Sequence, residues 1–326
     1  MSGVTVPAIV LVGGEGTRLR PLTCSVPKQL LPVAGIPLLR RVLQPLEDAG
    51  VKDVILSMGY RSESFAELEL GPFRITHAVE DTPLGSGDGL AHAVRGAGIT
   101  GTFIALNGDV IGDVEITSML RTHRESGADA TILLKAVPDP TEFGVALLSE
   151  DGNIARFIEK PRAPAPSNLI NAGAWVLETS ILDGIPEGGV SSIEREIFPA
   201  LATAGRLRGI LHEGWWHDVG RLDRYFAANQ ECVERCLLPE GWTVREGSLL
   251  APDAVVDPLA RVGRSVVGVG ARVGSGAVVE DSVLLDGSSV GPGATVHRSV
   301  LGPGWSVGEA DVVTDAICAE PGRPDA

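Results

Sequence analysis

The sequence has no excess of basic residues and no long apolar run. Its 326 residues include 27 Lys and Arg against 42 Asp and Glu, which gives a formal net charge of -15. A basic surface marks proteins that bind nucleic acid or anionic membranes, so we expect neither partner. No apolar run approaches the ~20 residues of a membrane-spanning helix, and the run at residues 8–12 is too short for a signal peptide. These absences predict a cytoplasmic protein.

Cysteine is also scarce. The four cysteines, Cys24, Cys232, Cys236 and Cys318, form no dense framework. A disulfide scaffold is therefore not expected, and free thiols are the simpler interpretation. Cys232 and Cys236 lie four residues apart on an expected helix, a spacing that allows a metal or redox pair. No second such pair lies nearby, so two ordinary thiols are favoured.

The first two-thirds of the chain alternates short apolar runs with helical patterns. We expect strands at residues 8–12, 51–58, 102–106 and 130–137, and helices at residues 37–49, 84–94 (after a short loop) and 117–126. This alternation predicts an α/β domain with a doubly wound, mainly parallel sheet that helices cover. Ligands of such sheets bind beyond the carboxyl ends of the strands.

The last third is rich in Gly, Val, Ser and Asp. Three segments of 17 residues, 265–281, 282–298 and 299–315, align without gaps, and apolar residues within a coil are spaced six, five and six apart. This pattern predicts a three-sided parallel β-helix of hexapeptide repeats with four coils. A β-sandwich is the alternative, but the strict register disfavours it. We expect an α/β domain at residues 1–236, a linker at 237–247, the β-helix at 248–319 and a tail at 320–326.

The segment "VLVGGEGTRLRPLT" at residues 10–23 follows an expected strand but matches neither common phosphate-binding loop. It lacks the Lys-Ser/Thr ending of a P-loop, and Leu19 stands where the dinucleotide motif has its last glycine. Gly13, Gly14 and Gly16 allow the backbone to approach a ligand and to point N–H groups at phosphate oxygens. Arg18 adds a cation. A glycine-rich turn with solvated arginines is the weaker alternative.

Three further charged residues suit the same chemistry. Lys28 in "SVPKQLLPV" can neutralise a triphosphate that is spread across the loop. Asp109 in "LNGDV" ends an apolar strand, and Asp218 stands in "GWWHDVGRLDRY". Two carboxylates suit Mg²⁺, which prefers oxygen ligands and phosphate partners. Taken singly, a strand-end Asp often caps a turn, and His217 beside Trp is more often structural.

Two other segments suit a phosphorylated sugar. In "FIEKPRAP", an anion-binding Lys160 stands next to Glu159, which can accept hydrogen bonds from hydroxyls. A charged strand end terminated by proline is the alternative. In "NAGAWV", Asn171 and a glycine can face sugar hydroxyls.

In this order, these motifs resemble those of the nucleoside-diphosphate-sugar pyrophosphorylases, or sugar-1-phosphate nucleotidyltransferases. The family hallmark "GGxGTRLxPLT…PK" is matched by residues 13–23 and 27–28. The further matches are Asn107-Gly108-Asp109, Phe143-Gly144-Val145, Glu159-Lys160-Pro161, Asn171-Ala172-Gly173 and Trp216-His217-Asp218-Val219-Gly220. Members often carry a C-terminal left-handed β-helix, so the resemblance covers nearly the whole chain.

The resemblance implies a Rossmann-like domain that joins an NTP and a sugar 1-phosphate to give an NDP-sugar and pyrophosphate. Its implied catalytic residues are Arg18, Lys28, Asp109 and Asp218, with Mg²⁺ as the cofactor bound by the two aspartates. The implied nucleotide-binding residues are Val12, Gly13, Gly14, Gly16, Thr17, Arg18, Gly85, Ser86, Asp88, Gly89, Asn107 and Gly108. The implied substrate-binding residues are Gly144, Glu159, Lys160, Asn171 and Gly173. Flat β-helix faces and family habit favour a homodimer or homotetramer.

Several stretches are most similar to the mannose-1-phosphate guanylyltransferase branch, above all "SSIEREIFPAL" at residues 191–201. GTP and mannose 1-phosphate, or a related sugar or cyclitol phosphate, are therefore the expected substrates. Two stretches depart from that branch, "GSGDGLAH" at residues 85–92 and "PKQL" at 27–30, and both are closer to glucose-1-phosphate thymidylyltransferases. Asp88 can accept hydrogen bonds from guanine, or it can be a solvated or helix-capping residue. A thymidylyl-, uridylyl- or adenylyltransferase is the alternative.

Two alternatives belong to other classes. A catalytically silent regulatory subunit is disfavoured because Arg18, Lys28, Asp109 and Asp218 are intact. A hexapeptide-repeat acyltransferase commonly needs a histidine base, and His297 is the only histidine in the repeats. The β-helix is therefore expected to serve in packing and self-association.

Overall fold

The computed structural model describes residues 6–24, 26–59, 62–65, 69–185 and 189–320. The chain divides into two compact units. The first, here called the sheet unit, comprises Met1–Gly14 and Val42–Trp216; the second, the β-helix unit, comprises Glu15–Arg41 and His217–Ala326. The glycine-rich loop therefore changes unit between Gly14 and Glu15. The domain boundaries expected from the sequence stay a prediction, and residues 321–326 of the expected tail lie outside the described residues.

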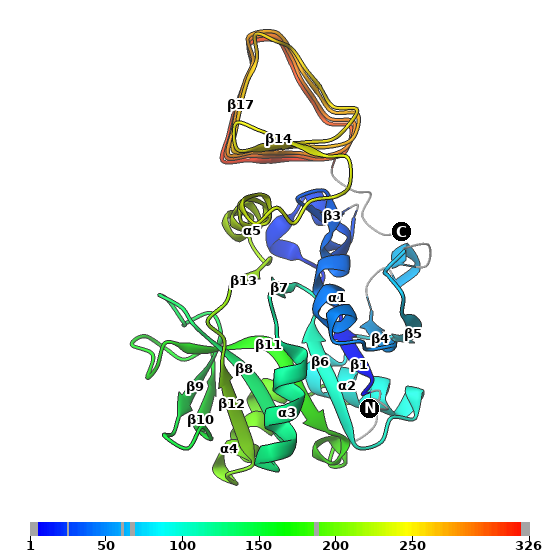
Figure 1. Ribbon diagram of the computed structural model, residues 1–326, viewed down its shortest axis with the longest axis vertical. Helices are drawn as coiled ribbons and strands as arrows, with labels where there is room; N and C mark the ends of the chain where they lie inside the picture. The colour runs from blue at the N-terminus through cyan, green and yellow to red at the C-terminus, as the bar shows by residue number, and fades with distance from the viewer. Residues whose placement is uncertain (1–5, 25, 60–61, 66–68, 186–188, 321–326) are drawn as a thin grey trace. The chain divides into compact units, whose positions relative to one another are not determined.

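The sheet unit is built on one nine-stranded sheet (Figure 1). Its strands are β1 (Ala8–Leu11), β4 (Asp53–Met58), β5 (Arg74–Val79), β6 (Thr102–Asn107), β8 (Ala130–Ala136), β9 (Gly144–Leu148), β10 (Ile154–Glu159), β11 (Leu169–Glu178) and β12 (Leu207–Leu211). Their order is β10-β9-β11-β6-β1-β4-β5, and β8 pairs with both β11 and β12. β6, β1, β4 and β5 run parallel, whereas β11 runs antiparallel to β6, β8 and β9.

The helices and short elements follow the expected order. The helices are α1 (Leu38–Asp48), α2 (Gly85–Ala97), α3 (Ile116–Ser126), α4 (Phe198–Thr203) and α5 (Leu222–Glu234). The short strands are β2 (Pro32–Val33), β3 (Ile36–Pro37), β7 (Val110–Gly112) and β13 (Trp216–Asp218). Single 3-10 turns lie at Thr17–Leu19, Leu22–Cys24, Lys28–Leu30, Ser62–Phe65 and Thr179–Leu182, and a π turn lies at Ile193–Ile197. The strands and helices expected from the alternation all form, within a few residues of their expected ends.

Helix packing buries the apolar faces of the sheet. α2 packs on β1, β4 and β5, α3 packs on β8 and β11, and α4 packs on β10 and β12. The aromatic centre of this core joins Trp175 of β11, Phe157 of β10 and Phe198 of α4, whose ring centroids lie 5.4–5.5 Å apart in edge-to-face pairs. Offset and edge-to-face aromatic pairs stabilise a core beyond the area that they bury.

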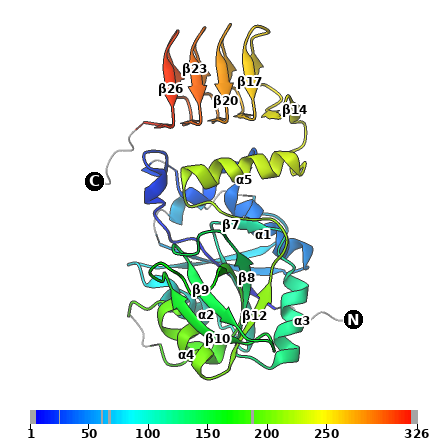
Figure 2. The same cartoon turned by 90° about the vertical axis from the view of Figure 1, so that its left-hand side faces the viewer.

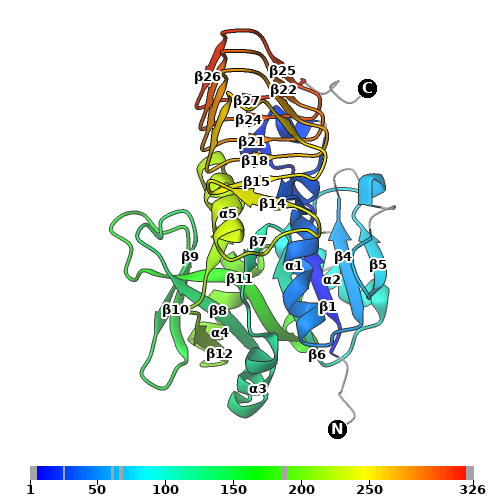
Figure 3. The same cartoon turned by 45° about the horizontal axis from the view of Figure 1, so that its top comes forward.

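The β-helix unit contains three parallel sheets whose strands recur along the chain. Their strands are β15 (Ser248–Leu250), β18 (Val266–Val267), β21 (Val283–Leu284), β24 (Val300–Leu301) and β27 (Ile317–Cys318); β16 (Val255–Val256), β19 (Arg272–Val273), β22 (Ser289–Val290) and β25 (Ser306–Val307); and β17 (Arg261–Gly263), β20 (Val278–Glu280), β23 (Thr295–His297) and β26 (Val312–Thr314). β14 (Thr243–Arg245) pairs antiparallel with β15. Figure 2 shows β17, β20, β23 and β26 side by side, and Figure 3 shows the stack of β15, β18, β21, β24 and β27.

The pairing register of these sheets is the predicted 17 residues. Val256 pairs with Val273, and Val273 pairs in turn with Val290. Their side chains and those of the other inward positions form one apolar stack inside the coils. The three-sided parallel β-helix predicted from the repeat is therefore confirmed.

Buried serines close one corner of every coil. Ser265 Oγ accepts a hydrogen bond from the backbone N–H of Ser282 (3.0 Å), and Ser282 Oγ accepts one from the N–H of Ser299 (3.2 Å). Ser282 Oγ also donates to the carbonyl of Glu280 (2.7 Å). The column continues from Ser248 to Ser299, and all its members are buried. These hydroxyls satisfy backbone groups that the turn between two sheets leaves without a strand partner.

The cysteines and the helix lengths bear on two expectations from the sequence. All four cysteines are free thiols, as predicted, but α5 ends at Glu234, so Cys236 lies beyond the helix rather than on it. The structure describes no helix long and apolar enough to cross a membrane.

Candidate functional site

The sheet unit holds the first part of the glycine-rich loop at the carboxyl end of β1. The backbone N–H of Val12 donates to the carbonyl of Ser57 at the end of β4 (2.8 Å), and that of Gly108 donates to the carbonyl of Leu11 (2.9 Å). A Cβ at Gly108 would lie 2.6 Å from that carbonyl oxygen, so only glycine allows this approach. Val12, Gly13 and Gly14 therefore leave the sheet at the edge where ligands of parallel sheets bind.

Asp109 lies in the turn between β6 and β7, one strand away from this loop. Its neighbour Asn107 packs against Gly173 of β11, where a Cβ would lie 2.9 Å from Asn107 Nδ2. Gly173 has a positive φ of 76°, which favours glycine there. Asn107, Gly108 and Asp109 therefore occupy the same carboxyl-end edge as Gly13.

The predicted sugar-binding residues cluster on β9, β10 and β11. Glu159 is the cross-strand partner of Gly144, and a Cβ at Gly144 would lie 2.9 Å from Glu159 Oε2. The Nζ of Lys160 lies 3.4 Å from Glu159 Oε1. Asn171 Oδ1 accepts hydrogen bonds from Trp175 Nε1 (2.7 Å) and from the N–H of Gly173 (3.0 Å). That oxygen supports β11, which leaves the amide NH₂ of Asn171 as the part that a ligand would contact.

Glu159 has a perturbed carboxyl group. Burial raises the pKa of Glu159, and the like charge of Glu194 raises it further. The charges of Lys160 and Arg195 act in the opposite direction and lower the pKa. A carboxyl group shifted mainly by desolvation is a common sign of a binding site.

The glycine-rich start of α2 carries the residues predicted to contact the nucleotide base. Gly85 has a φ of 78°, and the Oγ of Ser86 donates to Glu194 Oε2 (2.5 Å). Asp88 is only 2% exposed, and its Oδ1 accepts no hydrogen bond within the described part of the chain. A polar atom buried without a partner is costly unless a ligand or water satisfies it.

Asp88 lines a cavity of about 390 Å³ beside α2 and the end of β5. The other lining residues are Val79, Glu80, Asp81, Thr82, Leu84, His92, Arg95 and Gly96. Glu80 was missed in the sequence, although it is the first residue beyond β5. Its Oε1 accepts from Ser57 Oγ (3.1 Å) and its Oε2 accepts from the N–H of Leu84 (3.0 Å). Gly89 packs directly on this carboxylate, because a Cβ there would lie 2.7 Å from Glu80 Oε1.

The β-helix unit brings Arg18 and Asp218 together at Gly220. A Cβ at Gly220 would lie 2.8 Å from Asp218 Oδ1 and 3.0 Å from Arg18 Nη2. Asp218 Oδ2 also accepts a hydrogen bond from Arg224 Nη1 (2.7 Å). The sequence predicts a role for Arg18 and Asp218 but not for Arg224, which stands on α5 and was read only as part of the surrounding motif.

Lys28 is held against the second part of the glycine-rich loop. It is 6% exposed, and a Cβ at Gly16 would lie 3.1 Å from Lys28 Cβ. Gly16 has a φ of 64°, and its carbonyl accepts from Thr23 Oγ1 (2.9 Å). A left-handed glycine thus turns the chain so that Thr17 and Arg18 start a 3-10 turn beside the lysine.

Helix α5 fixes the segment that follows Lys28. The hydroxyl of Tyr225 donates to the carbonyl of Pro32 (2.6 Å), and Asn229 Oδ1 accepts from the N–H of Ala34 (2.7 Å). Complete burial raises the pKa of Tyr225, so this hydroxyl stays protonated as a donor. These buried bonds anchor the loop that carries the predicted catalytic lysine.

His217 has a structural environment, as its position beside Trp suggests. Its Nε2 lies 3.7 Å from Glu231 Oε2 on α5. Burial lowers the pKa of His217, although Glu231 acts to raise it. A half-buried imidazole that faces a helix carboxylate suits the packing role favoured from the sequence.

A divalent metal that binds phosphate oxygens takes carboxylate oxygens as its protein ligands. The predicted ligands are the carboxylates of Asp109 in the sheet unit and Asp218 in the β-helix unit. No cluster of three or more His, Cys, Asp or Glu able to hold a metal was found among the described residues. Mg²⁺ is commonly held by one or two carboxylates together with waters and substrate phosphates, rather than by an all-protein cage. Each of the two aspartates is therefore a donor of the type that such a metal takes.

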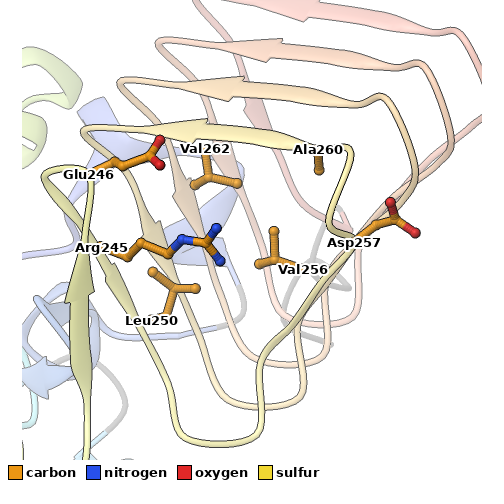
Figure 4. A pocket seen from close by; sticks show the side chains of 7 residues that line it. All are labelled: Arg245, Glu246, Leu250, Val256, Asp257, Ala260 and Val262. Atoms are coloured by element: carbon orange, nitrogen blue, oxygen red, sulfur yellow. The ribbon is translucent and has the colours of Figure 1, made fainter.

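The open end of the first β-helix coil has a cavity of about 40 Å³ (Figure 4). Leu250, Val256 and Val262 form its apolar wall, and the guanidinium of Arg245 points across it. No acid, base and nucleophile meet there among the lining residues. The cavity therefore gives no support to chemistry within the β-helix, and Arg245 caps the apolar stack.

Two family models match the chain. A model described as nucleotidyl transferase matches residues 7–235, and one described as GlmU-like, C-terminal hexapeptide matches residues 237–317.

Curated relatives cover most of the chain. The mannose-1-phosphate guanylyltransferase of Mycobacterium tuberculosis is 38% identical over 280 residues, which is 83% of this chain and 77% of that protein. The mannose-1-phosphate guanylyltransferase catalytic subunit beta of Drosophila pseudoobscura is 36% identical over 262 residues, which is 78% of this chain and 70% of that protein.

Solved structures match the fold over 69% of the chain. HddC from Yersinia pseudotuberculosis, crystallised with GMP-PN, aligns with a TM-score of 0.60 and 25% identity over 69% of this chain and 99% of its own. A putative glucose-1-phosphate thymidylyltransferase from Bacillus anthracis aligns with a TM-score of 0.63 and 26% identity over 69% of this chain and 94% of its own.

Proposed function

Since the chain belongs to the nucleotidyl transferase family, we propose that it joins GTP and mannose 1-phosphate, or a related sugar or cyclitol 1-phosphate, to give a GDP-sugar and pyrophosphate. The observation that carries this proposal is the meeting of Arg18 and Asp218 at Gly220. This closeness supports the proposal, because a cation suits a leaving pyrophosphate and a carboxylate suits the metal of a nucleotide complex.

The reaction is an in-line attack of a sugar-phosphate oxygen on the α-phosphorus. The bond from the α-phosphorus to the bridging oxygen of the β-phosphate breaks, and pyrophosphate leaves with the electron pair. Backbone N–H groups of Gly13, Gly14 and Gly16 hold phosphate oxygens, and Arg18 neutralises the leaving group. Lys28 neutralises charge at the reacting phosphate. No covalent enzyme intermediate is needed, because positioning and charge neutralisation supply the rate enhancement.

Asp109 and Asp218 are the proposed Mg²⁺ ligands. When bound, the metal supplies positive charge that orients the nucleotide phosphates and stabilises the transition state. Asp109→Asn and Asp218→Asn should therefore each reduce turnover at least a hundredfold with the fold intact by circular dichroism. Full activity of either variant would remove that aspartate from the metal site.

The sugar phosphate is assigned to the cluster on β9, β10 and β11. Glu159 accepts hydrogen bonds from sugar hydroxyls, and the amide of Asn171 donates one. Lys160 binds the phosphate, while Gly144 and Gly173 allow close backbone contact. The short distance between Lys160 and Glu159 (3.4 Å) supports this assignment, because phosphate and hydroxyl groups lie close together in a sugar 1-phosphate.

Guanine is the proposed base. The guanylyltransferase names of the curated relatives and the guanine nucleotide in the Yersinia structure support it. The buried carboxylate of Asp88 adds an acceptor suited to the N–H groups of guanine. A thymidylyltransferase remains the second candidate, because "GLAHAV" is similar to that branch and the Bacillus structure bears that name.

Pyrophosphate release tests the proposal. The protein is incubated with Mg²⁺, each common NTP in turn and a panel of sugar 1-phosphates, and we expect release with GTP and mannose 1-phosphate or a close analogue. Release with dTTP or UTP but not with GTP would overturn the base assignment. No release with any pair would overturn the proposed enzyme activity and favour a catalytically silent subunit.

We also propose that the protein is cytoplasmic and assembles as a homodimer or homotetramer through its β-helix. The flat parallel sheets of the β-helix support this assembly. Sedimentation equilibrium should give two or four times the 34.0 kDa of the chain, and a mass of one chain would contradict it.

A further inference from the structure

The start of α2 is held in place by the segment at residues 191–194. The backbone N–H of Gly87 donates to the carbonyl of Ser191 (3.0 Å), and the N–H of Ser191 donates to the carbonyl of Leu84 (3.2 Å). The contact leaves no room for side chains, because a Cβ at Gly85 or at Gly87 would lie 2.4 Å from an oxygen of Ser191. The proposed base-binding turn is thus in close contact with the segment that contains Ser191.

The turn comprises Gly85, Ser86 and Gly87, so Ser86 supplies its side-chain hydrogen bonds. Its Oγ donates to Glu194 Oε2 (2.5 Å) and accepts from the N–H of Ile193 (3.2 Å). The same Glu194 oxygen accepts from Ser192 Oγ (2.7 Å). Hydrogen bonds to a charged acceptor are stronger than neutral ones, so the carboxylate is the main anchor of the turn.

Glu194 lies on a π turn, Ile193–Ile197, which packs on both α2 and β10, the strand that ends at Glu159. Its charge also acts on Glu159, whose pKa it raises. π turns are rare and occur often at functional sites. The carboxylate of Glu194 therefore bonds to the proposed base-binding turn, and its charge acts on the proposed sugar carboxylate at the end of β10.

We propose that Glu194 is a positioning residue that sets the base-binding turn through Ser86 and tunes the sugar-binding carboxylate through its charge. This inference rests on the proposed function, which assigns the turn that contains Ser86 to the nucleotide base and Glu159 to the sugar. Glu194 lies in the stretch at residues 191–201 that is similar to the guanylyltransferase branch, but it is not among the predicted site residues.

Five variants separate the two roles. Ser86→Ala and Glu194→Ala both remove the hydrogen bond, so each should raise the Kd for GTP about tenfold, as measured by calorimetry. The double variant should be no weaker than either single one, because the same bond is lost. Glu196→Gln is the matched control: it lies on the same π turn, is exposed, and keeps the oxygen that accepts from the N–H of Ser192. We expect no change in that control.

Glu194→Gln isolates the charge. The amide keeps an acceptor for Ser86, so GTP binding should change by less than about threefold. Removing the charge lowers the pKa of Glu159, since the opposing charges of Lys160 and Arg195 remain. The acid limb of kcat/KM for the sugar 1-phosphate should therefore move to lower pH. An unmoved limb would overturn the tuning role.

Hydrogen exchange gives a readout that does not depend on turnover. Backbone amides of residues 85–89 should exchange faster in Ser86→Ala and Glu194→Ala than in the wild type and in the Glu196→Gln control. Unchanged exchange, or additive losses of GTP affinity in the double variant, would overturn the positioning role. If the wild type turns over another NTP, that nucleotide replaces GTP in the binding assay. If it turns over none, the proposed function fails while hydrogen exchange still decides the inference.

Discussion

At the residue scale, glycines mark where functional groups come close. A side chain at Gly108 would collide with the carbonyl of Leu11, and one at Gly144 would collide with Glu159. A side chain at Gly220 would collide with Asp218 and Arg18. The sequence reveals glycines as such, but it cannot say which neighbour makes a glycine necessary, because that neighbour is remote in the chain. Gly220 belongs to a recognised motif, yet its contact with Arg18 across about 200 residues of sequence is visible only in the structure.

Gly220→Ala tests this closeness. The new methyl group would displace Arg18 or Asp218, so kcat should fall at least tenfold while the melting temperature changes little. The matched control is Gly184→Ala, since Gly184 has no described atom within 4 Å of a Cβ. Steady-state kinetics with GTP and mannose 1-phosphate measures the effect. Equal activity of the two variants would contradict the proposed role of the Arg18 and Asp218 pair.

At the element scale, β1, β4, β6, β8 and the β-helix were predictable, while the antiparallel pairing of β11 was not. Alternating strands and helices identify β1, β4, β6 and the helices between them, because parallel neighbours need crossovers. β9 and β10 are joined by a short hairpin, whose turn is closed by a hydrogen bond from the N–H of Gly152 to Ser149 (2.9 Å). Such a hairpin contributes no helical pattern to the sequence. The antiparallel strands β9, β10 and β11 are therefore paired only in the structure, not by a pattern in the sequence.

The 17-residue repeat also predicts how the β-helix is stabilised. Replacing Ser282 with Ala leaves the N–H of Ser299 buried without its acceptor, which should cost about 1–3 kcal/mol. Ser289→Ala is the control, because Ser289 Oγ makes an exposed contact with Ser306 Oγ (2.8 Å). Urea unfolding followed by circular dichroism compares the two. If Ser289→Ala lowers the free energy of unfolding as much as Ser282→Ala does, the buried serine column contributes no more stability than an exposed serine.

At the scale of the whole molecule, the predicted fold class is confirmed: a Rossmann-like nucleotidyltransferase domain is followed by a left-handed β-helix of hexapeptide repeats. The motif order was sufficient to identify the family. Glu80, Glu194 and Arg224 were not predicted as site residues, because the contact that places each of them is not visible in the sequence, even where the residue lies in a quoted stretch. Ser86 shows the same limit, since its place in a motif does not reveal that Glu194 holds it.

The central claim is that the α-phosphorus of the nucleotide, not the γ-phosphorus, is attacked. Phosphorus NMR of the complete reaction with GTP, Mg²⁺ and mannose 1-phosphate tests it most directly. We predict that signals of a GDP-sugar and of pyrophosphate grow together in equal amounts while mannose 1-phosphate disappears. Formation of free GDP with a sugar 1-diphosphate would show attack at the γ-phosphorus and would contradict the account.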